Sequence, residues 1–252
     1  MAASLSDVVP LHIAEARIPA GPLAGARQLV VAFAITTAKG VVLFETGPGR
    51  PSFPTVSSEY GARSLDYYNM MVRPLEDELA LHGITLDDVR AIVNSHLHWD
   101  HCGGNPLFPG VPIYVQSAEY AAAQTGGRDY TVPDWVDFPG AEFVVIDGDT
   151  RIADGLRVIA TPGHSPGHQS LVLDTRDGPV AFAGQAIGGR ADYDQLLSTG
   201  AIEPTGVDAK GKHARAPEVV TSAQRLVDTG ARRVHFSHDH DIWERDGSHG
   251  VS

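Results

Sequence analysis

The sequence predicts an α/β fold in a single domain, and two observations support this prediction. Short apolar runs typical of strands alternate along the chain with a few segments of helical periodicity. The composition is even, with 42% of the 252 residues hydrophobic and 20% charged, as in ordinary globular proteins. Because no linker or change in composition divides the chain, residues 1–252 are expected to form one domain.

A β-hairpin is the first element expected. Leu29 to Ile35 and Val41 to Phe44 are apolar runs with the character of strands, and the short segment 36–40 joins them. The chain then turns through Gly47-Pro48-Gly49 into a loop rich in proline and serine. These residues predict two neighbouring antiparallel strands followed by an irregular segment.

A helix is expected from Ser64, which can cap it, to about His82. Met71, Leu75 and Leu79 recur every four residues, which places them on one face of such a helix. Gly83 follows directly and is typical of a helix end. The pattern therefore predicts a helix packed against the core.

The rest of the chain predicts further strands and short helices. A helical start at 85–88, a helix over 117–124 and a helix from Pro217 to Gly230 are expected. Pro217 suits the first helical turn and Gly230 suits the end. The expected strands are 91–94, 112–116, 142–146, 156–160, 170–173, 180–183 and, as the last, 233–236.

The balance of acidic and basic residues indicates which class of binding partner to expect. The formal net charge of −12, from 19 basic and 31 acidic residues, opposes binding to phosphate backbones, so nucleic acid is not expected as a partner.

The single cysteine, Cys102, excludes a disulfide within the chain and is interpreted as a small buried residue. No secretory signal or membrane-spanning run is found, so a cytoplasmic protein acting on a small molecule is expected, with its oligomeric state open.

Four possible metal ligands follow the strand 91–94 within six residues: His96, His98, Asp100 and His101. Histidines two residues apart point the same way when the backbone stays extended, and the next turn can present the other two from another side. Imidazole and carboxylate groups suit Zn²⁺. Chance clustering of surface histidines is the alternative, and the order of four ligands at a strand end disfavours it.

Two more histidines occupy the same kind of position. His164 follows the strand 156–160 within Thr161-Pro162-Gly163-His164, and His238 follows the last strand. A site at one edge of a sheet sandwich requires such repeated placement. His168 and His240 lie near these ligands and are interpreted as supporting groups.

The motif His96-x-His98-x-Asp100-His101, then Thr161-Pro162-Gly163-His164, then His238, resembles the signature of the metallo-β-lactamase superfamily. The resemblance implies an αββα sandwich of two mixed β-sheets flanked by helices. It also implies one zinc ion held by His96, His98 and His164 and a second held by Asp100, His101 and His238. The residues around these motifs resemble those of the N-acyl-homoserine lactonase branch of the family.

The sequence departs from this family at three positions. Gln185 stands where most two-metal members have a bridging aspartate, and a neutral amide cannot act as an anionic bridge. The second metal is therefore expected to bind more weakly, and a one-metal working form is the alternative. Glu45 replaces the aspartate of the usual Asp-Thr-Gly and is expected either to orient a ligand imidazole or to cap the turn. Gly188 replaces a catalytic tyrosine, for which nearby Tyr193 is the candidate substitute.

The resemblance implies hydrolysis of a lactone or related carboxylic ester by a metal-bound hydroxide. Asp100 would pass a proton to the leaving alkoxide, and Tyr193 would help hold the oxyanion. The alternatives are a thioester hydrolase of glyoxalase II type or a β-lactamase, then a phosphodiesterase, then a binding module without activity.

Overall fold

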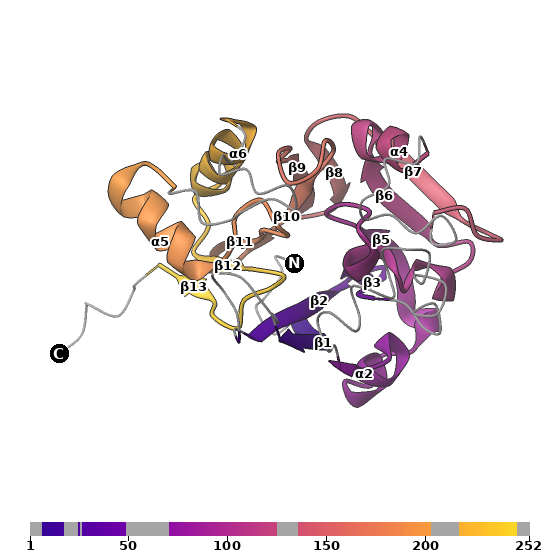
Figure 1. Cartoon of the computed structure of the whole chain (residues 1–252). Coiled ribbons are helices and arrows are strands. Elements are labelled where there is room, and N and C mark those ends of the chain that lie inside the picture. Colours follow the sequence, from indigo (N-terminus) through magenta and orange to yellow (C-terminus); the bar gives the residue numbers. More distant parts are fainter. Residues whose placement is uncertain are drawn as a thin grey trace. The chain divides into compact units, whose positions relative to one another are not determined.

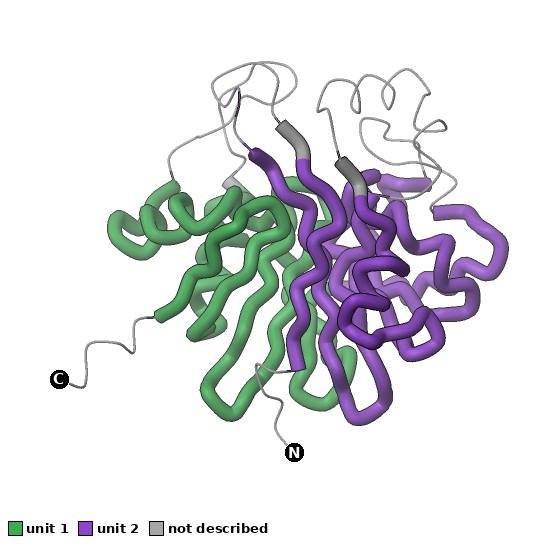
Figure 2. The backbone as a smooth tube through the Cα atoms, turned by 90° about the horizontal axis from the view of Figure 1, so that it is seen from below, with its two compact units in different colours: residues 1–4, 148–252 green, residues 5–147 purple. Residues whose placement is uncertain are grey.

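The computed structural model describes residues 7–17, 25, 27–48, 71–124, 136–202 and 217–245. The chain divides into two compact units, which Figure 2 shows in different colours. Unit 1 comprises Met1–Ser4 and Gly148–Ser252, and unit 2 comprises Leu5–Asp147. Each unit holds one β-sheet. The expectation of a single domain stays a prediction, and the units are described separately.

Unit 2 contains a mixed sheet of seven strands in the order β4-β1-β2-β3-β5-β6-β7. Figure 1 labels β1, β2, β3, β5, β6 and β7 of this sheet. Its strands are β1 (Val8–Arg17), β2 (Arg27–Thr37), β3 (Gly40–Phe44), β4 (Met71–Val72), β5 (Val89–Val93), β6 (Pro112–Gln116) and β7 (Glu142–Ile146). Strands β1 to β3 pair antiparallel, and β3, β5, β6 and β7 pair parallel. The carboxyl ends of β3 and β5 therefore meet at the same edge of the sheet.

The helices of unit 2 are short. They are α2 (Leu75–Leu81), α3 (Trp99–Cys102) and α4 (Ser117–Gln124), with 3-10 turns η2 (Leu86–Asp88) and η3 (Asn105–Leu107). Leu75 and Leu79 of α2 pack into a core with apolar residues of the central strands, including Leu43 and Ile92. This burial explains why a helix of only seven residues is stable, since helices of that length depend on tertiary packing.

Unit 1 contains a mixed sheet of six strands in the order β13-β12-β11-β10-β9-β8. The strands are β8 (Thr150–Ala153), β9 (Leu156–Ala160), β10 (Gln169–Thr175), β11 (Gly178–Phe182), β12 (Arg233–His235) and β13 (Trp243–Glu244). Helices α5 (Arg190–Thr199) and α6 (Pro217–Asp228) complete the described part of this unit, and both contribute to its core, through Leu196 and Leu226 respectively. Strands β11 and β12 pair parallel, and the other pairs are antiparallel.

Most of the predicted elements are confirmed. The hairpin β2–β3, strands β6, β7 and β9, and helix α4 lie where the sequence placed them. The expected helix from Ser64 to His82 is wrong at its start, because Met71–Val72 forms strand β4 and the helix begins only after Pro74. A proline disfavours helical backbone in the residue before it, so Arg73 separates the two elements. Residues 49–70 lie outside the described ranges.

Several regular elements were not predicted. Strand β13 follows the strand 233–236 that was expected to be the last, and the strands β1 and β8, the helices α3 and α5 and the 3-10 turn η3 were missed. Strand β1 contains Pro10 and a charged end, which weaken its sequence signal. Strand β1 is stabilised by hydrogen bonds to β2 along most of its length, and the local sequence does not indicate this pairing. Within the described ranges, no helix is long and apolar enough to cross a lipid bilayer.

Candidate metal centre

The loop after β5 carries the four clustered ligand candidates of unit 2. His96 and His101 are fully buried, and His98 and Asp100 are partly buried. The ring of His96 has its centroid 4.2 Å from that of His98 and 4.2 Å from that of His101. Imidazole nitrogens gathered at such distances can serve as ligands of bound metal ions.

A buried carboxylate on α4 supports this loop. The Leu97 backbone N–H donates to Oε1 of Glu119 at 2.9 Å, and Glu119 is 4% exposed. The contact fixes the peptide between His96 and His98 while the side chain of Leu97 packs into a small core cluster. Sequence reasoning missed Glu119, since nothing local connects it with a loop more than twenty residues earlier.

A second polar network holds the backbone of His101. Its carbonyl oxygen accepts hydrogen bonds from the Thr46 N–H (2.9 Å), from Thr46 Oγ1 (3.1 Å) and from Asn94 Nδ2 (3.1 Å). Asn105 Nδ2 in turn donates to Asn94 Oδ1 at 2.9 Å. A Cβ atom on Gly104 would lie 2.6 Å from the Thr46 carbonyl oxygen, so only glycine allows this approach.

Glu45 follows β3 in a left-handed backbone conformation, with φ of 68°, and is fully buried. Its carboxylate accepts from the Ser95 N–H at 3.2 and 3.3 Å, and its Oε1 lies 3.3 Å from His101 Nδ1. Non-glycine residues with positive φ are uncommon and concentrate at functional sites. The contact with His101 favours an orienting role over simple capping of the turn.

Cys102 belongs to the same region but is not a reactive thiol. Burial raises its pKa well above the usual value, and the nearby carboxylates of Glu45, Asp100 and Glu119 raise it further. Its side chain packs with those of Leu97 and Trp99 in one cluster. The interpretation of Cys102 as a small buried residue is confirmed.

His164 lies in unit 1 at the end of β9, on an exposed loop. The preceding Gly163 has a φ of 138°, and a Cβ there would lie 2.8 Å from the Val219 backbone nitrogen of α6. Ser222 Oγ donates to the Pro162 carbonyl oxygen at 2.6 Å. Helix α6 therefore fixes the loop that presents His164.

His168 fills a different role from a metal ligand. Its Nε2 accepts a hydrogen bond from the Gln185 backbone N–H at 2.9 Å. Its Nδ1 lies 3.0 Å from the Thr161 carbonyl oxygen and 2.9 Å from Thr161 Oγ1. An accepting Nε2 requires the proton on Nδ1, so both nitrogens of this fully buried ring are engaged. His168 thus supports the loops around Thr161 and Gln185, as the sequence suggested.

The remaining candidates of unit 1 lie near the ends of β11 and β12. Gln185 is partly buried two residues beyond Ala183, and His238 is partly buried three residues after β12. Asp239, next to His238, accepts from the Arg190 N–H at 2.8 Å and so links this loop to the start of α5. His240 is exposed and belongs to none of the ligand groups found among the described residues.

Tyr193 lies in the core of unit 1. Its side chain is 1% exposed and packs against Trp243 and Phe236, with ring centroids 5.0 and 6.1 Å away. Burial raises its pKa to about 12, while Arg245 acts in the opposite direction. The hydroxyl therefore stays protonated at neutral pH.

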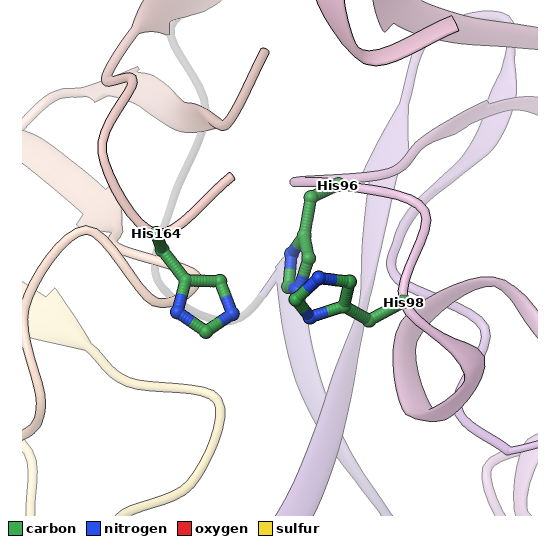
Figure 3. A group of neighbouring side chains, drawn as sticks. All are labelled: His96, His98 and His164. Atoms are coloured by element: carbon green, nitrogen blue, oxygen red, sulfur yellow. The ribbon is translucent and has the colours of Figure 1, made fainter. Parts of the chain in front are cut away.

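Within unit 2, the ligand atoms of Glu45, His96 and His101 all lie within 4.8 Å of one another, and this group was not predicted. Figure 3 shows the side chains of His96 and His98, on the loop after β5, and of His164, on the loop after β9. The assignment of His96, His98 and His164 to one zinc ion and of Asp100, His101 and His238 to a second stays a prediction. Three imidazoles, or two with a carboxylate, are donor sets that suit zinc.

Comparison with characterised proteins gives relatives over part of the chain. The chain is 43% identical over 93 residues to an N-acyl homoserine lactonase of Bacillus cereus, and this stretch covers 37% of the chain and 36% of the relative. It is 36% identical over 123 residues to the enzyme of the same name from Bacillus thuringiensis, with 48% of each chain covered. The aligned parts therefore span about half of these relatives or less.

Solved structures are similar over nearly the whole chain. A mutant of AiiA from Bacillus thuringiensis with N-decanoyl-L-homoserine at its active site has a TM-score of 0.69, at 26% identity and 92% coverage of both chains. An N-acyl homoserine lactone hydrolase with N-hexanoyl-L-homoserine at its catalytic metal centre also has a TM-score of 0.69, at 25% identity and 92% coverage of both chains. These similarities confirm the predicted α/β fold with two mixed sheets and helices. The family model described as the metallo-beta-lactamase superfamily matches residues 26–238. Since this match takes in most of the chain, the protein belongs to the metallo-β-lactamase superfamily.

Proposed function

We propose that the protein is a metal-dependent hydrolase that opens the ring of an N-acyl homoserine lactone or a related carboxylic ester. It would use two groups of ligands, His96, His98 and His164 with Asp100, His101 and His238. The observation that carries the proposal is the clustering of His96, His98, Asp100 and His101 on the loop after β5, where the ring centroid of His96 lies 4.2 Å from those of His98 and His101 and Asp100 lies beside His101. The relatives named above, which are N-acyl homoserine lactonases, support the choice of substrate class.

The two groups divide the metal chemistry between them. His96, His98 and His164 would hold one zinc ion, and Asp100, His101 and His238 the second. When bound, zinc supplies a Lewis acid for the lactone carbonyl and lowers the pKa of water toward neutrality. Gln185 offers only a neutral amide oxygen where most two-metal members of the family have a bridging aspartate, so the second ion would depend on its own three ligands.

The residues of this chain carry out the remaining steps. Asp100 is partly buried, with Oδ2 3.5 Å from His101 Nε2, and its carboxylate would take up the proton released by the attacking water and pass it to the leaving alkoxide. Glu119 and Glu45 hold the Leu97 and Ser95 peptides, which keeps the ligand loop in place before substrate arrives. Because water attacks the carbonyl carbon directly, no covalent intermediate with the protein is required.

Turnover of a substrate panel tests the proposal. Zinc-loaded protein is incubated with N-acyl homoserine lactones of short and long acyl chains, and acid release is followed. A thioester, a β-lactam and a phosphodiester serve as comparison substrates. We expect hydrolysis of the lactones above all others. Absence of lactone turnover at every chain length, or hydrolysis of the phosphodiester alone, would contradict the proposal.

Gln185→Asp is expected to raise the occupancy of the second metal, because it introduces the anionic ligand that most two-metal members of the family have at this position. Elemental analysis after dialysis against a fixed zinc concentration measures the number of ions per chain. Gln185→Asn is the matched control, since it has the length of aspartate and no charge. Equal stoichiometry and affinity in all three proteins would show that the account of Gln185 is wrong.

The role of Tyr193 in holding the oxyanion stays a prediction, and Tyr193→Phe tests it. If the protonated hydroxyl reaches the carbonyl, its removal lowers kcat by about 10²-fold with little change in KM. The thermal midpoint of the variant reports any loss of packing against Trp243. A change in kcat of less than about threefold would assign Tyr193 to the core alone, the role that its burial favours.

A further inference from the structure

A third set of ligand atoms lies wholly within unit 2. It consists of Glu45, His96 and His101, and each of these residues is 0% exposed. Their ligand atoms all lie within 4.8 Å of one another, and Glu45 Oε1 is 3.3 Å from His101 Nδ1. Two imidazoles with a carboxylate form one of the donor sets that bind zinc in proteins.

The charge of Glu45 gives a second reason to place a cation here. None of the ion pairs among the described residues joins this carboxylate to a lysine or arginine. Among the described residues, this carboxylate accepts a hydrogen bond from the Ser95 N–H, which is shared between both oxygens, and its other polar contact is with the imidazole of His101. A buried carboxylate with so little compensation is costly, and a bound divalent cation would offset that cost.

The spacing of the donors also fits. Tetrahedral zinc with bonds of about 2.0–2.1 Å separates its ligand atoms by roughly 3.3–3.4 Å, and the Glu45–His101 distance agrees with this. His96 Nδ1 is engaged with Ser95 Oγ at 2.7 Å, so Nε2 is its ligand atom. Glutamate reaches one methylene further than the aspartate that many members of the family have at this position, which brings its oxygens to the imidazoles.

We propose that Glu45, His96 and His101 form a third metal position, which holds the first divalent ion taken up by the metal-free protein. Since His96 and His101 also belong to the two groups of the proposed catalytic centre, this position is an alternative to them and adds no third ion. Its complete burial leaves no place for substrate, so it is a loading position. It requires residues of unit 2 alone.

The test follows the first equivalent of metal without any substrate. Metal-free full-length protein is titrated with Co²⁺, and the visible spectrum and the dissociation constant of the first equivalent are measured. Glu45→Gln keeps the size of the side chain and removes its charge. His164→Ala and His238→Ala are the matched controls, because each removes one ligand from a catalytic group and none from the third position. Thermal unfolding of each metal-free variant checks that it folds.

We expect Glu45→Gln to weaken the first equivalent by about 10-fold or more and to change its spectrum. His164→Ala and His238→Ala should leave that spectrum unchanged and its dissociation constant within about threefold. The proposal is overturned if Glu45→Gln leaves the first equivalent unaltered, or if either histidine variant alters it as much. Loss of lactone turnover in the histidine variants concerns the proposed function only, so failure of one proposal is distinguishable from failure of the other.

Discussion

Asp100→Asn is expected to lower kcat for lactone hydrolysis by about 10²–10⁴-fold, the range for loss of a positioned proton donor. The carboxylate has two tasks in the proposed mechanism, as a ligand with His101 and His238 and as the group that protonates the leaving alkoxide. Asparagine keeps the shape and one oxygen but carries neither the charge nor a transferable proton. Steady-state acid release with a short-chain and a long-chain lactone measures the effect.

Metal content separates the two tasks of Asp100. If the variant retains its zinc and loses turnover, proton transfer is the step affected; if it loses zinc, ligation is affected. Asp154→Asn is the control, because Asp154 is exposed in the turn between β8 and β9 and makes the same change of charge. A kcat within a factor of about three of the unaltered protein for Asp100→Asn would rule out both roles.

Gly163→Ala is expected to lower the free energy of unfolding by about 2–4 kcal/mol. The backbone there has a φ of 138°, which L side chains rarely adopt, and the new Cβ would lie 2.7 Å from Val219 Cγ2 and 2.8 Å from the Val219 nitrogen. Because the nitrogen belongs to helix backbone, the contact cannot be relieved by a rotamer change. The loop must shift instead, and His164 shifts with it. Denaturant unfolding and zinc content are the measurements.

Gly148→Ala is the control for backbone strain alone. Gly148 has a positive φ of 69°, but a Cβ there would meet nothing within 4 Å. We expect it to cost about 1–2 kcal/mol and to leave zinc binding unchanged. If both variants lose the same free energy of unfolding, contact with Val219 adds nothing to the cost of Gly163→Ala. If Gly163→Ala keeps its zinc content, a shift of this loop does not displace His164 from its role as a ligand.

The local pattern of apolar residues was sufficient to predict several strands. The hairpin β2–β3 and strands β6, β7 and β9 are rich in apolar residues, so each can be recognised without knowing which strand pairs with it. The start of α2 was misplaced for the opposite reason. Met71 fits the helical spacing, but Pro74 ends the extended segment and pairing with β1 makes Met71–Val72 a strand.

The sequence by itself determined the fold class, the family and the six ligand candidates. These depend on the spacing of histidines directly after apolar strands, which can be recognised from neighbouring residues alone. Only the tertiary structure decided what surrounds them. The contacts of Glu119 with Leu97, of Asn105 with Asn94 and of Glu45 with His101 each join residues from different elements or loops of unit 2. Such contacts depend on which strand ends meet at one edge of a sheet, and strand pairing is a property of the whole fold rather than of any segment.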